Sequence, residues 1–233
     1  MVHFEQELGV LKNTLLTMAS RSEAAVNLAV EAVVNRDYDL AQRVRADDEI
    51  IDQLELDVDE IAIRLLAMAP LASDLRLITV AMKVSQNLER VADEACKIAK
   101  RARDLNQEPP LKLALGIPRL ADMAVQMVKR ALDTFVRQDP AEARSLVPQD
   151  KEVDALNKQI HRQLADQMIA SPDTITRCLN LMVVAKSLER IADHGKNIAE
   201  EVVYLCEAED IRHTGKTKAP APPAGEMPEQ PGS

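Results

Sequence analysis

The chain contains few aromatic residues and few residues that interrupt helices. Phe, Trp and Tyr together make up 2% of its 233 residues, with no Trp, and only 6 residues are Gly. A core built with so few aromatic side chains must consist of Leu, Ile, Val, Met and Ala, which suits packed helices better than a β-sandwich. Because hydrophobic residues still make up 46% of the chain, we expect it to fold around a sizeable core.

The chain also lacks the features of several functional classes. Its 29 basic residues are outnumbered by 38 acidic ones, which argues against nucleic-acid binding and allows cations or basic protein surfaces as partners. The 3 cysteines match no zinc or CxxC spacing, so we expect reduced thiols in a cytoplasmic protein. We find no signal peptide and no run of about 18 apolar residues, and therefore expect no direct membrane insertion.

Sequence motifs of common enzymes are missing as well. The chain contains no Gly-rich phosphate loop and neither a GxSxG nor an HExxH motif. The cysteines lie on apolar helical stripes, where they are better interpreted as small core residues than as nucleophiles. We therefore expect no catalytic residues and no enzymatic activity.

Apolar residues recur at helical spacing along most of the chain and predict six long helices. We expect them at about residues 5–35, 40–68, 73–105, 111 or 118–137, 139–170 and 171–207. Pro70 should end the second helix, Ser73 with Asp74 should cap the third, and Pro140 suits the first turn of the fifth. Helices this long, joined by short connections, fold back on one another as antiparallel bundles.

The second half of the chain repeats the first. Leu-Glu-Arg-Val-Ala-Asp at residues 88–93 returns as Leu-Glu-Arg-Ile-Ala-Asp at residues 188–193. An Asp-x3-Asp pair in the second predicted helix returns 102 residues later in the fifth. We therefore expect an all-α fold of two tandem, structurally similar antiparallel three-helix bundles, followed by a disordered C-terminal tail. The boundaries that we predict are residues 1–107, 108–210 and 211–233.

Each half places two pairs of carboxylates on helices that should lie next to each other. Residues i and i+4 of a helix share one face about 6 Å apart, so antiparallel packing can bring two such pairs together. Four carboxylates at one place repel strongly unless a cation neutralises them, and oxygen ligands suit Mg, Mn, Ca or Fe ions. The predicted metal ligands are Asp48, Asp52, Glu89, Asp93, Asp150, Asp154, Glu189 and Asp193.

A solvated acidic face is the simpler interpretation of these pairs. Arg90 and Arg190 each follow a Glu of the motif and could neutralise it without any metal. The recurrence of the same spacing on two helices of each half favours the metal site. His161 alone is better interpreted as an exposed helix residue than as a ligand. The chain contains no Glu-x-x-His pair, which argues against a ferritin-like di-iron oxidase.

Taken together, these motifs resemble those of the PhoU family of phosphate-specific transport system accessory proteins. Besides the two Glu-Arg-x-Ala-Asp segments, Pro-Leu-Ala-Ser-Asp-Leu-Arg at residues 70–76 is similar to a family hallmark before the third helix. The opening His-Phe-Glu-Gln-Glu-Leu at residues 3–8 also looks like the start of the family's sequences. The resemblance covers about residues 3–210.

This resemblance implies a function that helical periodicity does not show. It implies a cytoplasmic negative regulator of the phosphate-starvation response that controls phosphate uptake and homeostasis. Such a protein would link the ATPase subunit of the phosphate ABC transporter to a phosphate-sensing histidine kinase. PhoU-like proteins bind multinuclear metal clusters through these acidic motifs, which implies the same eight ligands in this chain.

The second half departs from the family pattern, and several alternatives stay open. Ser-Pro-Asp-Thr-Ile-Thr-Arg at residues 171–177 replaces the hallmark, and Asn157 and His161 stand where the first half has Glu55 and Asp59. We therefore expect the stronger metal site in the first half. A metal-dependent phosphohydrolase or a purely structural bundle are the alternatives to the adaptor. The sequence leaves the identity of the metal open, and also whether the protein forms a homodimer.

Overall fold

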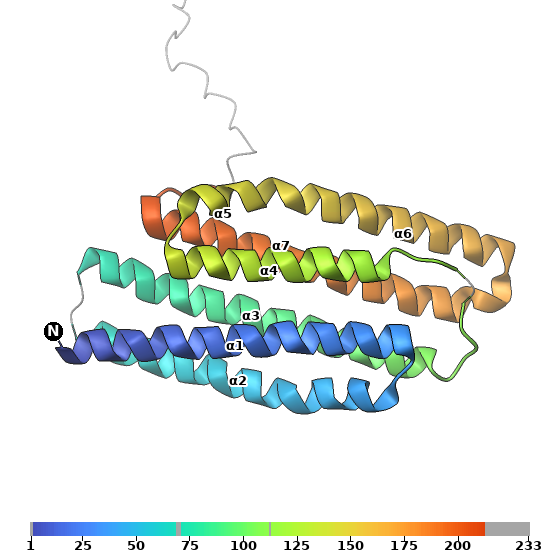
Figure 1. Cartoon of the computed structure of the whole chain (residues 1–233), viewed down its shortest axis with the longest axis horizontal. Helices are drawn as coiled ribbons and strands as arrows, with labels where there is room; N and C mark the ends of the chain where they lie inside the picture. Colours follow the sequence, from blue (N-terminus) through green and yellow to red (C-terminus); the bar gives the residue numbers. More distant parts are fainter. Residues whose placement is uncertain (1, 69–70, 112, 213–233) are drawn as a thin grey trace, which may run out of the picture.

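The computed structural model of the chain describes residues 2–68, 71–111 and 113–212 and is mainly α-helical. The first half contains α1 (Val2–Asn35), α2 (Tyr38–Ala67) and α3 (Ala72–Leu105). The second half contains α4 (Ile117–Arg137), α5 (Pro140–Leu146), η1 (Val147–Gln149), α6 (Asp150–Ala170), η2 (Pro172–Thr174) and α7 (Ile175–Glu207). Long neighbours in the chain run antiparallel (Figure 1), which confirms the expected fold of two tandem three-helix bundles.

The fifth predicted helix is interrupted in the structure. We expect one helix at residues 139–170, but the chain forms α5, the short 3₁₀ helix η1 and then α6. Pro148 lies in η1, and proline has no amide hydrogen and collides with the carbonyl four residues earlier in a helix. The interruption places Asp150, a predicted metal ligand, at the first residue of α6.

The start of α3 also differs from the expected cap. The N-cap residue is Leu71, and Asp74 lies in the first turn of the helix. Asp74 Oδ2 accepts a hydrogen bond from the Leu71 backbone amide at 3.3 Å, so the carboxylate stabilises the helix start from inside the helix. Pro70, the predicted end of the second helix, lies outside the described residues, as does the predicted tail from residue 213 onwards.

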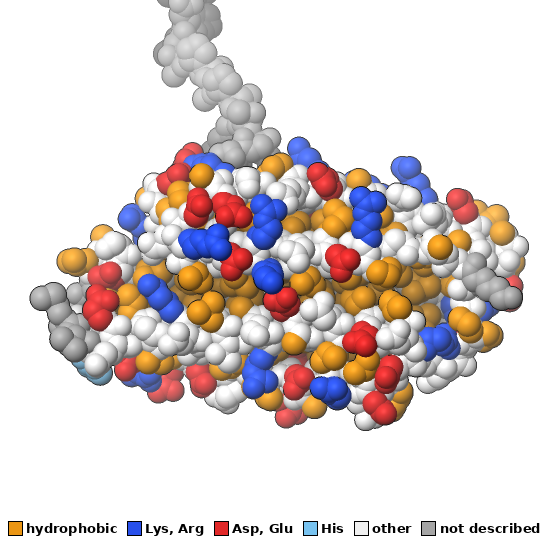
Figure 2. All heavy atoms as spheres, in the orientation of Figure 1, with side chains coloured by type: hydrophobic (Ala, Val, Ile, Leu, Met, Phe, Trp, Pro, Cys, Tyr) orange, Lys and Arg blue, Asp and Glu red, His pale blue; other side chains and the backbone are white. Residues whose placement is uncertain are grey.

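The two bundles pack side by side, with α3 against α7 and α1 against α4 (Figure 1). α3 therefore packs against α1, α2 and α7, and its Ile78 and Ser85 side chains are fully buried. Figure 2 shows apolar side chains gathered along the line where the bundles meet on the α1–α4 side. Leu16 and Val136, 45% and 54% exposed, border that junction.

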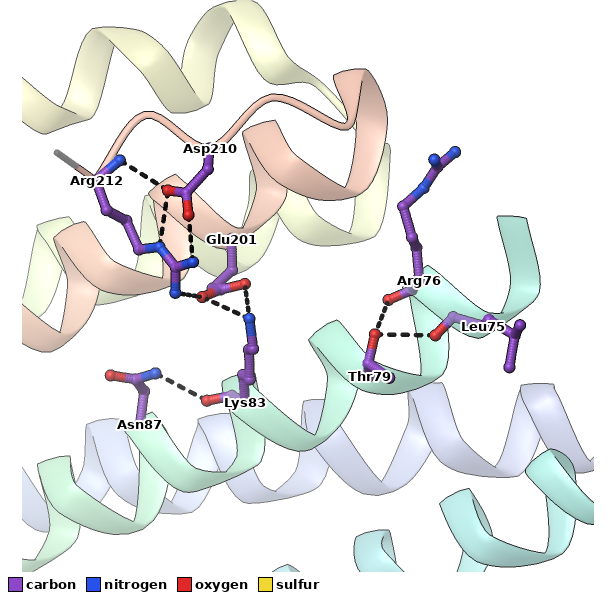
Figure 3. Close-up of polar contacts among 8 residues, drawn as sticks. All are labelled: Leu75, Arg76, Thr79, Lys83, Asn87, Glu201, Asp210 and Arg212. Carbon is purple, nitrogen blue, oxygen red and sulfur yellow. Dashed lines mark hydrogen bonds and ion pairs between the residues drawn. The ribbon is translucent and has the colours of Figure 1, made fainter. Parts of the chain in front are cut away.

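Charged side chains cross the α3–α7 seam (Figure 3). Lys83 Nζ on α3 lies 2.9 Å from Glu201 Oε2 on α7, and Arg212 approaches Glu201 Oε1 at 3.1 Å. Farther along the seam, Arg190 of the second half lies 3.3 Å from Glu94 Oε1 of the first half. The two halves are therefore joined by ion pairs as well as by apolar contacts.

Within the described ranges, no helix combines the length and the hydropathy required to cross a membrane.

Candidate functional site

The first acidic cluster lies between α2 and α3. Asp48 and Asp52 are one helical turn apart on α2, and Glu89 and Asp93 have the same spacing on α3. Burial raises the pKa of Asp48, a hydrogen bond with Cys96 opposes this shift, and the charges of Asp52 and Asp93 add to it. The antiparallel packing therefore brings the predicted ligands of the two helices together.

Glu89 is strongly perturbed within this cluster. Burial, followed by the charge of Asp93, raises the pKa of Glu89 to about 6, while Arg90 opposes the shift. Arg90 Nε lies 3.2 Å from Glu89 Oε2, and Arg90 Nη1 lies 3.2 Å from Asp93 Oδ2. In the first half, Arg90 therefore neutralises the carboxylates of the motif, as the sequence suggests, although its side chain is 55% exposed.

Glu55 is a further carboxylate of the first cluster and is missing from the predicted ligands. Burial raises its pKa, and the charges of Asp59, Asp52 and Asp93 contribute. The charge of Glu55 in turn helps to raise the pKa of Glu89. The signal in the sequence was the continuation of the acidic row of α2 by one more turn, from Asp52 to Glu55.

The second acidic cluster lies between α6 and α7. Its predicted ligands are Asp150 and Asp154 on α6 and Glu189 and Asp193 on α7. Burial, then the charges of Asp150 and Glu189, raises the pKa of Asp193 to about 6, and Asp154 adds to the shift. The structure therefore brings the four predicted residues of the second half together, as it does those of the first half.

Two lysines of α7 contact this second cluster, and sequence reasoning missed both. Lys196 Nζ lies 2.7 Å from Asp150 Oδ2 and 3.9 Å from Asp193 Oδ1. Lys186 Nζ lies 2.6 Å from Glu189 Oε2. Each lysine is three residues from a carboxylate of its own helix, a spacing that places the two side chains on one face and could have indicated the contact.

Several polar atoms near the second cluster are buried without a hydrogen-bond partner. They are Asp150 Oδ1, Asn157 Oδ1, His161 Nε2 and Glu189 Oε2, although Glu189 Oε2 forms the ion pair with Lys186. Asp150 and Asn157 are each 8% exposed. The expectation that His161 is exposed is wrong, because its row of α6 faces α7 and the side chain is half-buried. An unsatisfied buried oxygen destabilises the fold unless a donor or a cation satisfies it.

Both clusters offer the donor chemistry that hard cations prefer. Carboxylate and amide oxygens are the usual ligands of Mg²⁺ and Ca²⁺ in proteins. Among the residues that the structure describes, no group of three or more His, Cys, Asp or Glu side chains is arranged to hold a metal ion. The oxygens thus gather and repel one another without forming a coordination shell.

His194 and the cysteines have other environments. His194 Nδ1 lies 2.9 Å from Asn87 Oδ1, so its ring faces α3 across the seam between the halves. The cysteines are free, and Cys178 is fully buried. Burial, together with the charge of Asp48, raises the pKa of Cys96 to about 12, which keeps this thiol protonated and unreactive at neutral pH.

Comparison with known proteins agrees with this architecture. The family model described as the PhoU domain matches two segments of the chain, residues 15–102 and 117–202. The phosphate-specific transport system accessory protein PhoU homolog of Pseudomonas aeruginosa is 42% identical over 217 residues, which cover 92% of this chain and 90% of the relative.

Two solved structures have the same fold. The crystal structure of PhoU from Pseudomonas aeruginosa matches with a TM-score of 0.85 at 41% identity, over 88% of this chain and 100% of that one. The phosphate transport system regulatory protein PhoU from Streptococcus pneumoniae matches with a TM-score of 0.82 at 25% identity, over 89% of this chain and 99% of that one. With the domain matched twice and relatives alike in sequence and fold, the chain belongs to the PhoU family.

Proposed function

We propose that this protein is a regulatory accessory protein of phosphate uptake that represses the phosphate-starvation response when phosphate is plentiful. The observation that carries this proposal is its membership of the PhoU family along nearly the whole chain. We infer that it acts in the cytoplasm as an adaptor without enzymatic activity. Its two partners would be the ATPase subunit of the phosphate ABC transporter and a phosphate-sensing histidine kinase.

The adaptor role is tested by capture of partners from membranes. The tagged protein, incubated with membranes of cells grown at high and at low phosphate, should retain the transporter ATPase subunit and the histidine kinase at high phosphate. Deleting the gene should leave the starvation response active in phosphate-rich medium. Capture of neither partner, with a starvation response that is still repressed after deletion, would contradict the proposal.

The absence of enzymatic activity has a separate test. Purified protein loaded with Mn²⁺ or Mg²⁺ should release no phosphate from simple phosphate esters beyond the rate of a heat-denatured sample. Release that disappears with Glu89→Ala would instead support the metal-dependent phosphohydrolase. Light scattering of the same sample determines whether the protein is a homodimer in solution.

We further propose that both acidic clusters bind divalent or iron-type cations. The first would use Asp48, Asp52, Glu89 and Asp93, and the second would use Asp150, Asp154, Glu189 and Asp193. The proposal is supported by the mutual repulsion of these carboxylates and by the buried Asp150 Oδ1, which has no hydrogen-bond partner. A bound cation would neutralise the clusters and hold α2 against α3 and α6 against α7.

Calorimetric titration with Mn²⁺ tests cation binding. The wild type should bind the ion, and Glu89→Ala combined with Asp93→Ala should remove the binding that belongs to the first half. A matched control is Glu49→Ala with Glu60→Ala, because both of these side chains are exposed on α2. Binding that persists unchanged in the Glu89/Asp93 variant would exclude the first cluster as the site.

A further inference from the structure

The two acidic clusters carry different residues at equivalent positions of α3 and α7. The motif Glu-Arg-x-Ala-Asp recurs at an interval of 100 residues, which aligns Gln86 with Lys186 and Cys96 with Lys196. A neutral amide and a neutral thiol in the first half thus correspond to two ammonium groups in the second. Both lysines lie on the face of α7 that carries Glu189 and Asp193.

The partner helices differ in the same direction. At an interval of 102 residues, Glu55 of α2 aligns with Asn157 of α6. Glu55 contributes its charge to the first cluster, whereas Asn157 brings a neutral amide to the second. The replacements on both helices therefore make the second cluster less negative than the first.

The lysine contacts are direct and partly shielded from water. Lys196 Nζ lies 2.7 Å from Asp150 Oδ2, and its side chain is only 28% exposed. Lys186 Nζ lies 2.6 Å from Glu189 Oε2; the lysine side chain is 47% exposed and the glutamate side chain is 10% exposed. The Lys196–Asp150 contact is a charge-assisted hydrogen bond, a strong type of contact, and its partial burial reduces its screening by salt. The Lys186–Glu189 contact is an ion pair.

The first cluster has no equivalent lysines. Its carboxylates Glu89 and Asp93 pair with Arg90, whose side chain is 55% exposed. The corresponding Arg190 does not serve the second cluster, because it lies 3.3 Å from Glu94 across the seam. Each half therefore has its own means of neutralisation. In the first half these are the exposed side chains of Arg90 and of Arg45, whose charge acts on Asp48, and in the second half they are two lysines.

We propose that Lys186 and Lys196 are built-in counter-ions of the second cluster, so that the first cluster depends on a divalent cation and the second does not. This inference rests on the proposed cation binding of the acidic clusters, and it makes the second cluster the weaker of the two sites. A cation that enters the second cluster must displace or approach ammonium groups, and like charges repel at these distances. The first cluster would thus be the part of the protein that responds to divalent cations.

The test compares two double variants. The first carries Lys186→Met and Lys196→Met, and the matched control carries Lys151→Met and Lys158→Met. The two control lysines are exposed on α6. Methionine keeps the length of the side chain and removes its charge. Each protein is melted in the presence of a chelator and again with Mn²⁺, and each is titrated with Mn²⁺ by calorimetry.

The wild type should bind Mn²⁺ more tightly at the first cluster than at the second. The double variant Glu89→Ala/Asp93→Ala should lose this tighter binding, whereas the double variant Glu189→Ala/Asp193→Ala should keep it. The Lys186/Lys196 variant should melt at a lower temperature than the control in chelator and should recover with Mn²⁺. Its second cluster should gain at least about tenfold in Mn²⁺ affinity, because two repelling charges have been removed.

Two results would overturn the inference. One is a Lys186/Lys196 variant that melts like the control in chelator and gains no Mn²⁺ affinity. The other is wild-type protein that binds Mn²⁺ equally tightly at both clusters, which would still support the proposed cation binding. If no protein binds Mn²⁺, the proposed cation binding fails, and with it the dependence of the first cluster on a cation. A Lys186/Lys196 variant that melts lower in chelator would then support only the counter-ion role of the two lysines.

Discussion

Glu94, Glu189, Glu200 and Glu201 are each at most 7% exposed, although charged side chains are rarely buried to this extent without partners. For Glu94, Glu189 and Glu201, a lysine nitrogen lies within 2.9 Å of a carboxylate oxygen. These ion pairs offset the loss of hydration that burial imposes on a carboxylate. Glu200 differs from them, because the charges of Lys196 and Arg212 oppose its pKa shift without cancelling it.

Replacing Glu200 by Gln should stabilise the protein at neutral pH. Burial raises the pKa of Glu200 above its ordinary value of 4.5, so the folded state binds this proton more tightly than the unfolded state. The wild type therefore gains stability from this group as the pH falls through the folded pKa, and lacks that gain at neutral pH. Glu200→Gln should raise the melting temperature by roughly 1–3 °C at pH 7.5.

Thermal melts between pH 4 and pH 8 check this prediction. The advantage of Glu200→Gln should shrink toward zero as the pH approaches the pKa of the unfolded chain. Glu49→Gln, at an exposed position of α2, should show no such pH dependence. A Glu200→Gln protein that is less stable than the wild type at every pH would show that the charge of Glu200 is favourable.

Gly195 is required where α7 approaches α4. A Cβ atom at this position would lie 2.8 Å from the backbone nitrogen of Val128 and 2.9 Å from the carbonyl carbon of Met127. Gly195→Ala should therefore destabilise the protein by roughly 1–3 kcal/mol in chemical denaturation, because the two helix backbones must move apart.

Gly9 is the matched control for this substitution. A Cβ atom at Gly9 would meet nothing within 4 Å, so Gly9→Ala in α1 should stabilise the protein by about 0.5–1 kcal/mol. Equal effects at both positions would show that the close approach of α7 to α4 is not the reason why residue 195 must be a glycine.

At the scale of helices, the periodicity of apolar residues predicted the ends of most of the long helices to within a few residues. The missed interruption between α5 and α6 has a local cause. Pro148 follows a helical turn directly, and apolar residues such as Leu146 and Val153 continue on both sides of it. The spacing of apolar residues is the same whether or not one backbone amide lacks its hydrogen. The break at η1 therefore became visible only in the backbone geometry.

The turn from α4 to α5 depends on a specific cap. Gln138 adopts φ 53°, and Asp139 then caps α5 by accepting a hydrogen bond from the Glu142 amide at 3.0 Å. Asp139→Ala should cost about 1 kcal/mol in the free energy of unfolding, because one amide of this short helix loses its partner. Asp139→Asn should retain most of the stability in the same denaturation experiment. Equal losses for both substitutions would point to the charge of Asp139 instead of its capping bond.

At the scale of the whole molecule, the α3–α7 seam makes the two bundles one structural unit. Lys83 of the first half and Arg212 beyond α7 both contact Glu201, and Lys83 Nζ also lies 5.5 Å from the centroid of the Tyr204 ring. Because apolar and ionic contacts are shared along these two long helices, we expect the halves to unfold together.

Lys83→Met tests this ionic link. It should lower the free energy of unfolding by roughly 1–3 kcal/mol, because the buried carboxylate of Glu201 loses one of its two cations. Adding Glu201→Gln to Lys83→Met should recover part of the loss, since the uncompensated charge is then removed. The measurement is chemical denaturation followed by circular dichroism. Two separate transitions, or no recovery in the double variant, would contradict a seam that couples the halves through this charge.

The sequence by itself determined the helices, the internal repeat and the pairing of carboxylates such as Glu89 with Asp93, because these depend on spacings within one helix. It also indicated that neighbouring helices bring such pairs together. Only the tertiary structure decided which helices of the two halves meet, and with them partners such as Lys83 and Glu201. The spacing within α7 already placed Lys186 three residues from Glu189, but only the packing of α6 against α7 brought Lys196 to Asp150.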